Sequence, residues 1–87
     1  MTKINFDKVC VEWVDIQSCD DAWNSKESFD KLLPAFCTTI GYLYASNENF
    51  VKTFATFSHD ADSDTTDYGD CVVIPRGCVL SITKLEN

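Results

Sequence analysis

Gly41-Tyr42-Leu43-Tyr44-Ala45-Ser46-Asn47-Glu48-Asn49-Phe50-Val51 has the composition of two strands joined by a polar turn. β-branched and aromatic residues, which favour strands, dominate both flanks. The four residues Ser46–Asn49 supply turn chemistry. We therefore predict a hairpin with strands over Thr38–Ala45 and Phe50–Ser58. Phe54 and Phe57 fall on opposite faces of the second strand, which indicates either two partly covered faces or a bend through a bulge.

The segment before this hairpin predicts one strand and one helix. Lys8–Ile16 alternates apolar and polar residues with a period of two, as a half-buried strand does. After the polar break Gln17–Asp21, a helix is expected over Ser25–Leu33, capped by Asn24 with Glu27 three residues later. Its apolar stripe consists of Phe29, Leu32 and Leu33, and Pro34 ends it. Because so short a helix is marginal alone, we expect it to pack on the sheet.

The segment after the hairpin predicts an acidic loop and two closing strands. The loop covers His59–Asp70, and the strands cover Cys71–Ile74 and Cys78–Leu85. Pro75-Arg76-Gly77 forms a tight corner between them, where glycine would supply a backbone shape that other residues avoid. The predicted order is β-α-β-β-β-β. This order predicts a mainly β fold with one short helix, a single domain over residues 1–87, and a small five-stranded barrel, since closure removes exposed edges.

The net charge of −7 bears on the choice of partner. Asp and Glu outnumber Lys and Arg by 14 to 7, so the surface repels phosphate backbones and anionic membranes and favours basic protein partners. No apolar run reaches the roughly 18 residues that a membrane span needs. The first seven residues lack the apolar core of a signal peptide, so a cytoplasmic protein is expected.

The five cysteines indicate free thiols. Their odd number, in a chain without an export signal, argues against a disulfide framework. Cys19 lies among polar residues, whereas the other four lie in apolar stretches and are expected to be buried and inert: Cys10, Cys37, Cys71 and Cys78. There is no Cys-x-x-Cys pair, so neither zinc binding nor a catalytic pair with His59 is favoured. We expect no metal and no cofactor.

Asp60-Ala61-Asp62-Ser63-Asp64 resembles the start of a calcium-binding EF-hand loop. The sixth position would be Thr65 rather than glycine, and the twelfth would be Cys71 rather than glutamate. A solvated acidic loop is therefore favoured over weak Ca²⁺ binding.

Two segments together resemble the motifs of Sm-like proteins, which are small barrels of the SH3 type. In the first, Gly41, Leu43 and Phe50 match, and Asn47 stands where an aspartate is usual; the second is Val72-Val73-Ile74-Pro75-Arg76-Gly77-Cys78-Val79. The resemblance implies a five-stranded Sm/SH3-like barrel. It does not carry RNA binding with it, because Val51 replaces the asparagine that contacts a base, Pro75 is inserted, and the helix follows the first strand.

The chain also resembles short phage-encoded proteins with a Val-x-Trp-x-Asp start (here Val11–Asp15) and an Ile-Pro-Arg-Gly corner (here Ile74–Gly77). That resemblance implies a viral source and the cytoplasm of an infected host cell.

The candidate ligand-binding residues are Arg76, Gly77, Tyr42, Tyr44 and Asn47. Arg76, the one arginine of the chain, presents a planar fork suited to phosphate or carboxylate, or else pairs with a nearby acid. Tyr42 and Tyr44 share a strand face, where they either stack on a flat ligand or pack in the ordinary way. Trp23, among polar residues, is the better candidate for an exposed aromatic; Trp13 is expected in the core.

No acid–base pair, phosphate loop or nucleophile motif is present in the sequence, so we expect a protein that is not an enzyme. The predicted function is that of a small binding module, a self-associating accessory protein of a phage. We expect it to bind either a small anionic ligand, such as a nucleotide, or a host protein, and so to counter host defence. An Sm-like RNA-binding protein and a structural accessory protein are the alternatives. Neither a membrane nor nucleic acid is the expected partner.

Overall fold

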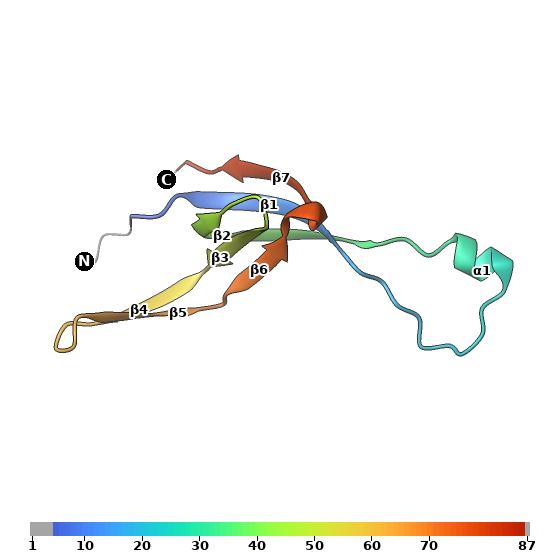
Figure 1. Cartoon of the computed structure of the whole chain (residues 1–87), viewed down its shortest axis with the longest axis horizontal. Coiled ribbons are helices and arrows are strands. Elements are labelled where there is room, and N and C mark those ends of the chain that lie inside the picture. The colour runs from blue at the N-terminus through green and yellow to red at the C-terminus, as the bar shows by residue number, and fades with distance from the viewer. Residues whose placement is uncertain (1–4, 87) are drawn as a thin grey trace.

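Strands predominate in the computed structural model, which describes residues 5–86, and one short α-helix interrupts them (Figure 1). This agrees with the mainly β class predicted from the sequence. The elements in chain order are β1 (Lys8–Asp15), α1 (Lys26–Asp30), β2 (Ala35–Ser46), β3 (Phe50–Phe54), β4 (Thr56–Asp60), β5 (Thr65–Gly69), β6 (Val72–Pro75), the 3₁₀ segment η1 (Arg76–Cys78) and β7 (Val79–Lys84).

The strands form two antiparallel sheets. One has five strands in the order β6-β3-β2-β1-β7, and the other is the β4–β5 hairpin. A flat five-stranded sheet would hold its edge strands about 19 Å apart. Here the edge strands β6 and β7 are joined only by the three residues of η1, which span about 6 Å. The sheet must therefore curl, although β6 and β7 do not pair within the described residues and no closed barrel is formed.

The inner face of the curled sheet carries the aliphatic core. Val9, Val11, Val51 and Ile74 are almost completely buried. Their alternation along β1, β3 and β6 places every second side chain on this face, as the pleat requires. Partly buried side chains extend the core: Trp13, Leu43, Val72, Cys78, Val79 and Ile82.

Most predicted strands are confirmed, but the segment after Phe54 differs from the prediction. The expected continuous strand Phe50–Ser58 breaks at Ala55 into β3 and β4. The expected loop His59–Asp70 is wrong, because it contains the end of β4 and all of β5. This hairpin is largely exposed and polar on both faces, so it lacks the apolar alternation that would have revealed it.

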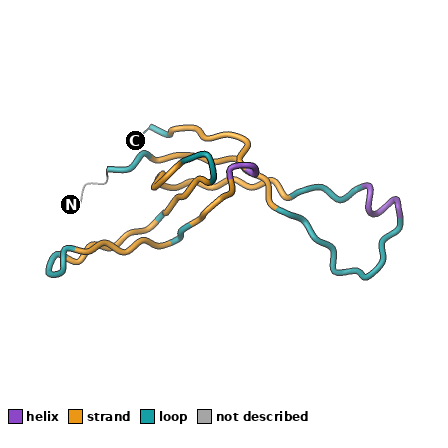
Figure 2. The backbone as a smooth tube through the Cα atoms, viewed as in Figure 1, coloured by secondary structure: helices purple, strands orange, loops and turns teal. Residues whose placement is uncertain are grey.

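The helix is shorter than predicted, and the expectation that it packs on the sheet is wrong. Ser25, not Asn24, caps it, and its side chain accepts a hydrogen bond from the Ser28 N–H (3.1 Å). We call residues 16–34 the arm. The arm leaves the sheet after Asp15 and returns at Ala35, the residue paired with Asp15. In Figures 1 and 2 the arm projects from the sheet as a long loop that carries α1 at its far end.

The molecule is elongated because the arm and the β4–β5 hairpin project to opposite sides of the five-stranded sheet (Figure 1). Its radius of gyration is 17.5 Å and its extents are 59 × 26 × 23 Å. A compact chain of this length would have a radius of about 12 Å. Within residues 5–86, no helix has the length and apolar character needed to cross a membrane.

Two further expectations are corrected. Gly77 does not have a positive φ, so the corner does not need glycine there; the described residues with positive φ are Asp64 and Asp70. All five cysteines are free, as expected, and Cys19 is exposed. Of the four cysteines expected to be buried, Cys10, Cys37 and Cys78 are half-buried. Cys71 is exposed, because it lies in the bend between β5 and β6.

Candidate functional site

An apolar cleft of about 350 Å³ lies where the β4–β5 hairpin leaves the five-stranded sheet. We call it the aromatic cleft. Side chains or backbone of β2, β3, β5 and β6 and of the bend before β6 line it: Tyr44, Lys52, Thr53, Phe54, Tyr68, Cys71 and Val73. It opens on the outer face of the sheet, opposite the aliphatic core.

Phe54 forms the centre of the cleft floor and is only 2% exposed. Five aromatic rings surround it, with ring centroids 4.8–6.4 Å from its own: those of Phe6, Tyr42, Tyr44, Phe57 and Tyr68. Edge-to-face pairs of this kind add stabilisation beyond the area they bury. The cluster therefore forms a second core on the outer face and fixes the root of the hairpin.

Tyr44 and Tyr68 form the part of this cluster that solvent reaches. They are 45% and 40% exposed, and their ring centroids lie 5.2 Å apart in an edge arrangement. Because the two rings contact each other, a flat ligand would lie against them and not between them. A planar group would bury apolar area there and meet ring edges and faces.

Lys52 supplies the positive charge of the cleft. Its Nζ lies 5.2 Å from the centroid of the Phe50 ring and 6.0 Å from that of Tyr44. Within residues 5–86 no carboxylate lies within 4 Å of this ammonium group. The ammonium is thus held over two rings, with its capacity to pair with an anion unused.

Local backbone features position these side chains. A β-bulge between Leu43 and Ala45 shifts the register of β2 against β3 at Tyr44. At the hairpin root the Ala55 N–H donates to the Gly69 carbonyl (3.2 Å). The Thr56 hydroxyl donates to Asp70 (2.7 Å), whose φ of 53° turns the chain towards β6. The break at Ala55 also brings Phe57 against Phe54, although strict alternation would place the two on opposite faces.

The five residues predicted from the sequence do not converge on one cleft. Tyr44 lines the aromatic cleft, and Tyr42 packs against Phe54 with their ring centroids 5.5 Å apart. Asn47 holds the β2–β3 turn, since its Oδ1 accepts from the N–H groups of Asn49 (2.8 Å) and Phe50 (2.9 Å).

Arg76 and Gly77 lie at the other end of the strands. Arg76 donates its backbone N–H to the Asn49 carbonyl (3.0 Å) and lines a separate, shallower depression with residues of β7. Gly77, beside it in η1, is exposed.

Sequence reasoning missed Lys52, Phe54 and Tyr68. A signal for the first two was present, because Phe50, Lys52 and Phe54 alternate along β3 and so share one face. Tyr68 carried no such signal, since it reaches the cleft only through the unpredicted hairpin.

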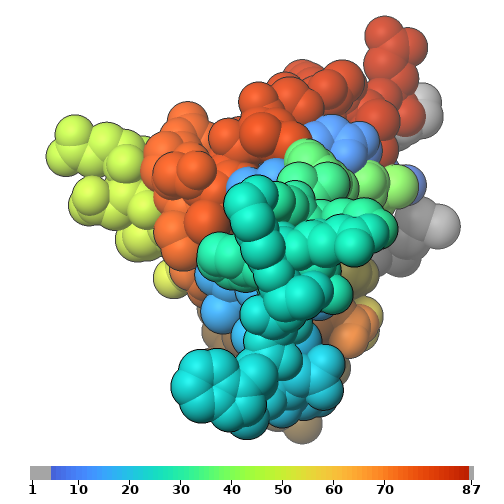
Figure 3. Space-filling model, turned by 90° about the vertical axis from the view of Figure 1, so that its right-hand side faces the viewer, coloured from blue at the N-terminus to red at the C-terminus, as the bar shows by residue number. Residues whose placement is uncertain are grey.

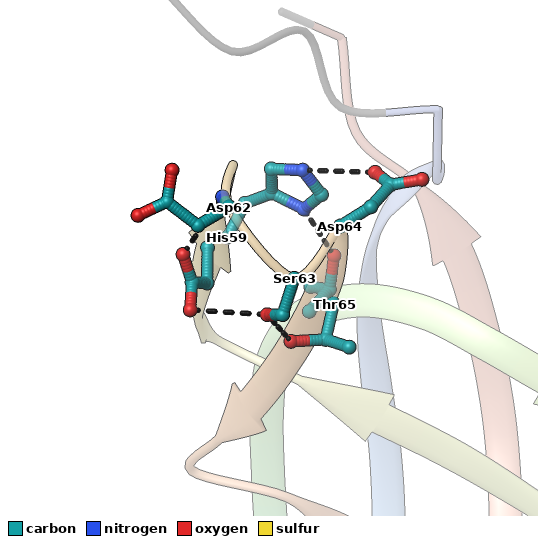
Figure 4. A network of polar contacts seen from close by, with 7 residues as sticks. His59, Asp62, Ser63, Asp64 and Thr65 are labelled. Atoms are coloured by element: carbon teal, nitrogen blue, oxygen red, sulfur yellow. Dashed lines mark hydrogen bonds and ion pairs between the residues drawn. The ribbon is translucent and has the colours of Figure 1, made fainter.

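The acidic segment forms the tip of that hairpin, and its polar groups bond to one another (Figure 4). Asp60 accepts from the Ser63 hydroxyl (3.0 Å) and the Asp62 N–H (3.0 Å), and these bonds lower its pKa below the ordinary 3.8. His59 lies 2.8 Å from the Thr66 hydroxyl and 3.4 Å from an Asp64 oxygen. The network therefore stabilises the turn, and within residues 5–86 no three metal-ligating side chains converge.

Compared with protein-family models, curated proteins and solved structures, the chain matches none of them. Its function is argued below from the geometry of the aromatic cleft.

Proposed function

We propose that the protein is a non-enzymatic binding module, and that its aromatic cleft takes a planar aromatic group that carries a negative charge beside the ring. The observation that carries this proposal is the unpaired Lys52 ammonium held over aromatic rings at the mouth of an apolar cleft. The rings of Tyr44 and Tyr68 supply apolar contact, and Lys52 supplies the charge. Both the apolar contact and the positive charge are needed, because contact with a flat apolar surface alone does not favour an anion over a neutral ring.

The charge of the whole chain sharpens this selectivity. In a protein with a net charge of −7, anions are repelled from most of the surface. An anion that binds must reach a local cation whose charge is not already neutralised. Lys26, Lys31 and Lys84 each pair with an acid, whereas no described acid pairs with Lys8, Lys52 or Arg76. Of these three cations, Lys52 is the one that lines the aromatic cleft.

The proposal includes self-association and a ligand from outside the protein. Large apolar side chains remain exposed on the single chain, and burial between copies is one way in which small domains gain stability. The resemblance to short phage-encoded proteins extends the proposal to a ligand of host origin, either a small anion such as a nucleotide or a host protein surface, bound to counter host defence.

We also propose that the curled sheet is an open form of the small Sm/SH3-like barrel. The order β6-β3-β2-β1-β7 and the 3₁₀ link between β6 and β7 support this interpretation. RNA binding gains no such support. Val51, at the position of the RNA-contacting asparagine in the resemblance, is fully buried in the core, and the net charge opposes a phosphate backbone.

The test is a ¹H–¹⁵N NMR titration of the full chain with indole-3-acetate, a planar aromatic anion. The proposal predicts shifts that centre on Tyr44, Lys52, Tyr68 and Val73. Lys52→Met should weaken binding by about tenfold or more, as the loss of one charge contact does. The matched variant Lys84→Met removes a lysine that pairs with Asp7 and should bind as the wild type does.

Two comparisons decide the outcome. Indole-3-ethanol has the same ring system without the charge and should bind more weakly than indole-3-acetate. Equal binding of the two, or shifts elsewhere, would overturn the proposal. Arg76→Ala should leave binding unchanged, and a loss of binding in that variant would move the site to the Arg76 depression.

A further inference from the structure

The arm is an excursion of the chain with little structure of its own. Its helix α1 has five residues. At the two ends of α1, the backbone N–H groups of Phe29, Lys31 and Leu32 donate to carbonyls three or four residues earlier. A helix of one turn does not persist alone in water. Figure 3, which looks onto the end of the molecule formed by the arm, shows its cyan and teal atoms standing in front of the sheet. Burial against the sheet therefore does not hold the arm, since α1 has no buried residue.

Apolar side chains of the arm are exposed. Trp23 is 92% exposed, Ile16 86%, Phe29 67% and Leu33 66%. At roughly 200 Å² for a large apolar side chain in the open, these four side chains present about 600 Å² of apolar surface. Ile16, Phe29 and Leu33 line one shared depression of the arm. Exposed apolar surface of more than a few hundred Å² marks an interface, and a standard interface buries about 800 Å² on each partner. The arm is therefore large enough to be one side of an interface.

The charges of the arm are arranged around Trp23. Lys26 pairs with Asp30 (2.6 Å) and Lys31 pairs with Glu27 (3.3 Å), so these four side chains neutralise one another. The acids that remain are Asp20 and Asp21, two and three residues before Trp23. The arm thus carries an exposed planar aromatic side chain with negative charge beside it.

We infer that Trp23 of one copy of this protein seats in the aromatic cleft of a second copy, with Asp20 or Asp21 beside Lys52. This inference rests on the proposed function, because it places a second occupant in the same cleft, with which the outside ligand would compete. The arm and the hairpin that borders the cleft project to opposite sides of the molecule (Figure 1), so a chain cannot fill its own cleft. The contact joins different surfaces of two copies, so it forms a reciprocal pair, a ring or an open filament, depending on the rotation between the copies.

A second copy would cover three features that the single chain leaves exposed. The contact buries the most exposed aromatic side chain of the arm, covers Tyr44 and Tyr68, and pairs Lys52 with an acid. A central aromatic anchor in a pocket, with a charged pair at its rim, is the arrangement that dominates binding energy in protein interfaces. The polar side of the arm remains in water.

Two native cysteines report directly on this contact. Cys19 is exposed on the arm four residues before Trp23, and Cys71 is exposed at the edge of the cleft. A short bis-maleimide added to a mixture of ¹⁴N and ¹⁵N chains should join Cys19 of one chain to Cys71 of another. Mixed-isotope peptides identify the link as intermolecular. Cys19→Ser and Cys71→Ser should each abolish it.

Trp23→Ala should weaken self-association, measured by sedimentation velocity, by about 30-fold or more, as expected for an interface hot spot. Leu80→Ala is the matched control, because Leu80 is 61% exposed on β7, outside the arm and the cleft; it should associate as the wild type does. The circular dichroism spectrum of Trp23→Ala should keep its β-sheet signal, since Trp23 is outside both cores.

The outcomes separate this inference from the proposed function. An oligomer that forms without the Cys19–Cys71 link, or that Trp23→Ala leaves intact, overturns the inference. A chain that is monomeric at 100 μM but binds indole-3-acetate through Lys52 overturns the inference and the self-association part of the proposed function. It leaves the aromatic-anion site at Lys52 standing. A chain that neither associates nor binds the probe contradicts both.

Discussion

Gly41→Ala tests the packing that holds β2 against β3. Gly41 is buried in β2 opposite Val9. A Cβ at this position would come within 2.8 Å of the Phe54 carbonyl oxygen, closer than real Cβ contacts occur. Since that oxygen belongs to the backbone of β3, the strand pair itself must shift. Because a backbone atom cannot move aside as the end of a side chain can, the cost lies in the upper part of the usual overpacking range, about 2–3 kcal/mol. A gain of about 0.4–1 kcal/mol from a less flexible unfolded chain leaves a net loss of about 1–2.6 kcal/mol.

Gly77→Ala is the matched control, because a Cβ there meets nothing within 4 Å and Gly77 does not have a positive φ. The Gly77 variant should gain about 0.4–1 kcal/mol in the free energy of unfolding. At about 4–8 °C per kcal/mol, Tm should fall by roughly 4–21 °C in Gly41→Ala and rise by a few degrees in Gly77→Ala. Thermal unfolding followed by circular dichroism measures both, at one fixed protein concentration, because self-association makes Tm depend on concentration. A Gly41 variant as stable as the wild type, or a Gly77 variant that loses as much as the Gly41 variant, would refute this reasoning.

Three further predictions concern side chains. Thr39→Val should lower the free energy of unfolding in urea by about 1–3 kcal/mol, because the part-buried Trp13 indole N–H donates to the Thr39 hydroxyl (2.9 Å) and would lose its acceptor. Thr38→Val is the control: its hydroxyl is exposed, so the loss should be less than about 0.5 kcal/mol. Phe54→Ala should cost about 3–5 kcal/mol, while the largely exposed Phe36→Ala should be nearly neutral; similar losses in the two variants would contradict the aromatic core. Ser63→Ala should raise the pKa of Asp60 towards 3.8, measured by NMR of the carboxyl carbon. Because folding lowers the pKa of Asp60, the Asp60 carboxylate stabilises the fold above about pH 3.8, and this stabilisation is lost as the pH falls through the lower folded value. The urea midpoint of Ser63→Ala should therefore decline less than that of the wild type over this acidic range.

The five-stranded sheet was largely predictable, because its strands alternate between a buried and an open face. The alternation of Val9, Val11 and Trp13 marks β1, and the polar Ser46–Asn49 marks the turn between β2 and β3. Each of these signals is local, so the sequence alone was enough to predict these strands and their turn. The β4–β5 hairpin gave no such signal, since a ribbon exposed on both faces needs no apolar period.

The arm shows a different limit of sequence reasoning. The stripe of Phe29, Leu32 and Leu33 indicated an apolar helix face, but a stripe does not say which surface covers it. We expected the sheet of the same chain, and these side chains are exposed instead. Their partner depends on surfaces outside the segment, which periodicity does not encode.

The candidate site was predictable from the sequence only where its residues lie on regularly alternating strands. Tyr44 follows from its strand, and the alternation of Phe50, Lys52 and Phe54 would have placed Lys52 among aromatic residues. Tyr68 and Cys71 join the cleft only through the break at Ala55 and the left-handed turn at Asp70. Those two backbone features are set by tertiary contacts, so the complete cleft required the structure.

The measurement that tests the account most directly is sedimentation velocity of the full chain from 1 to 100 μM, with and without excess indole-3-acetate. The account predicts particles of more than one chain that dissociate to single chains when the aromatic anion occupies the cleft. A single chain at every concentration, or an oligomer whose mass the anion does not change, would contradict it.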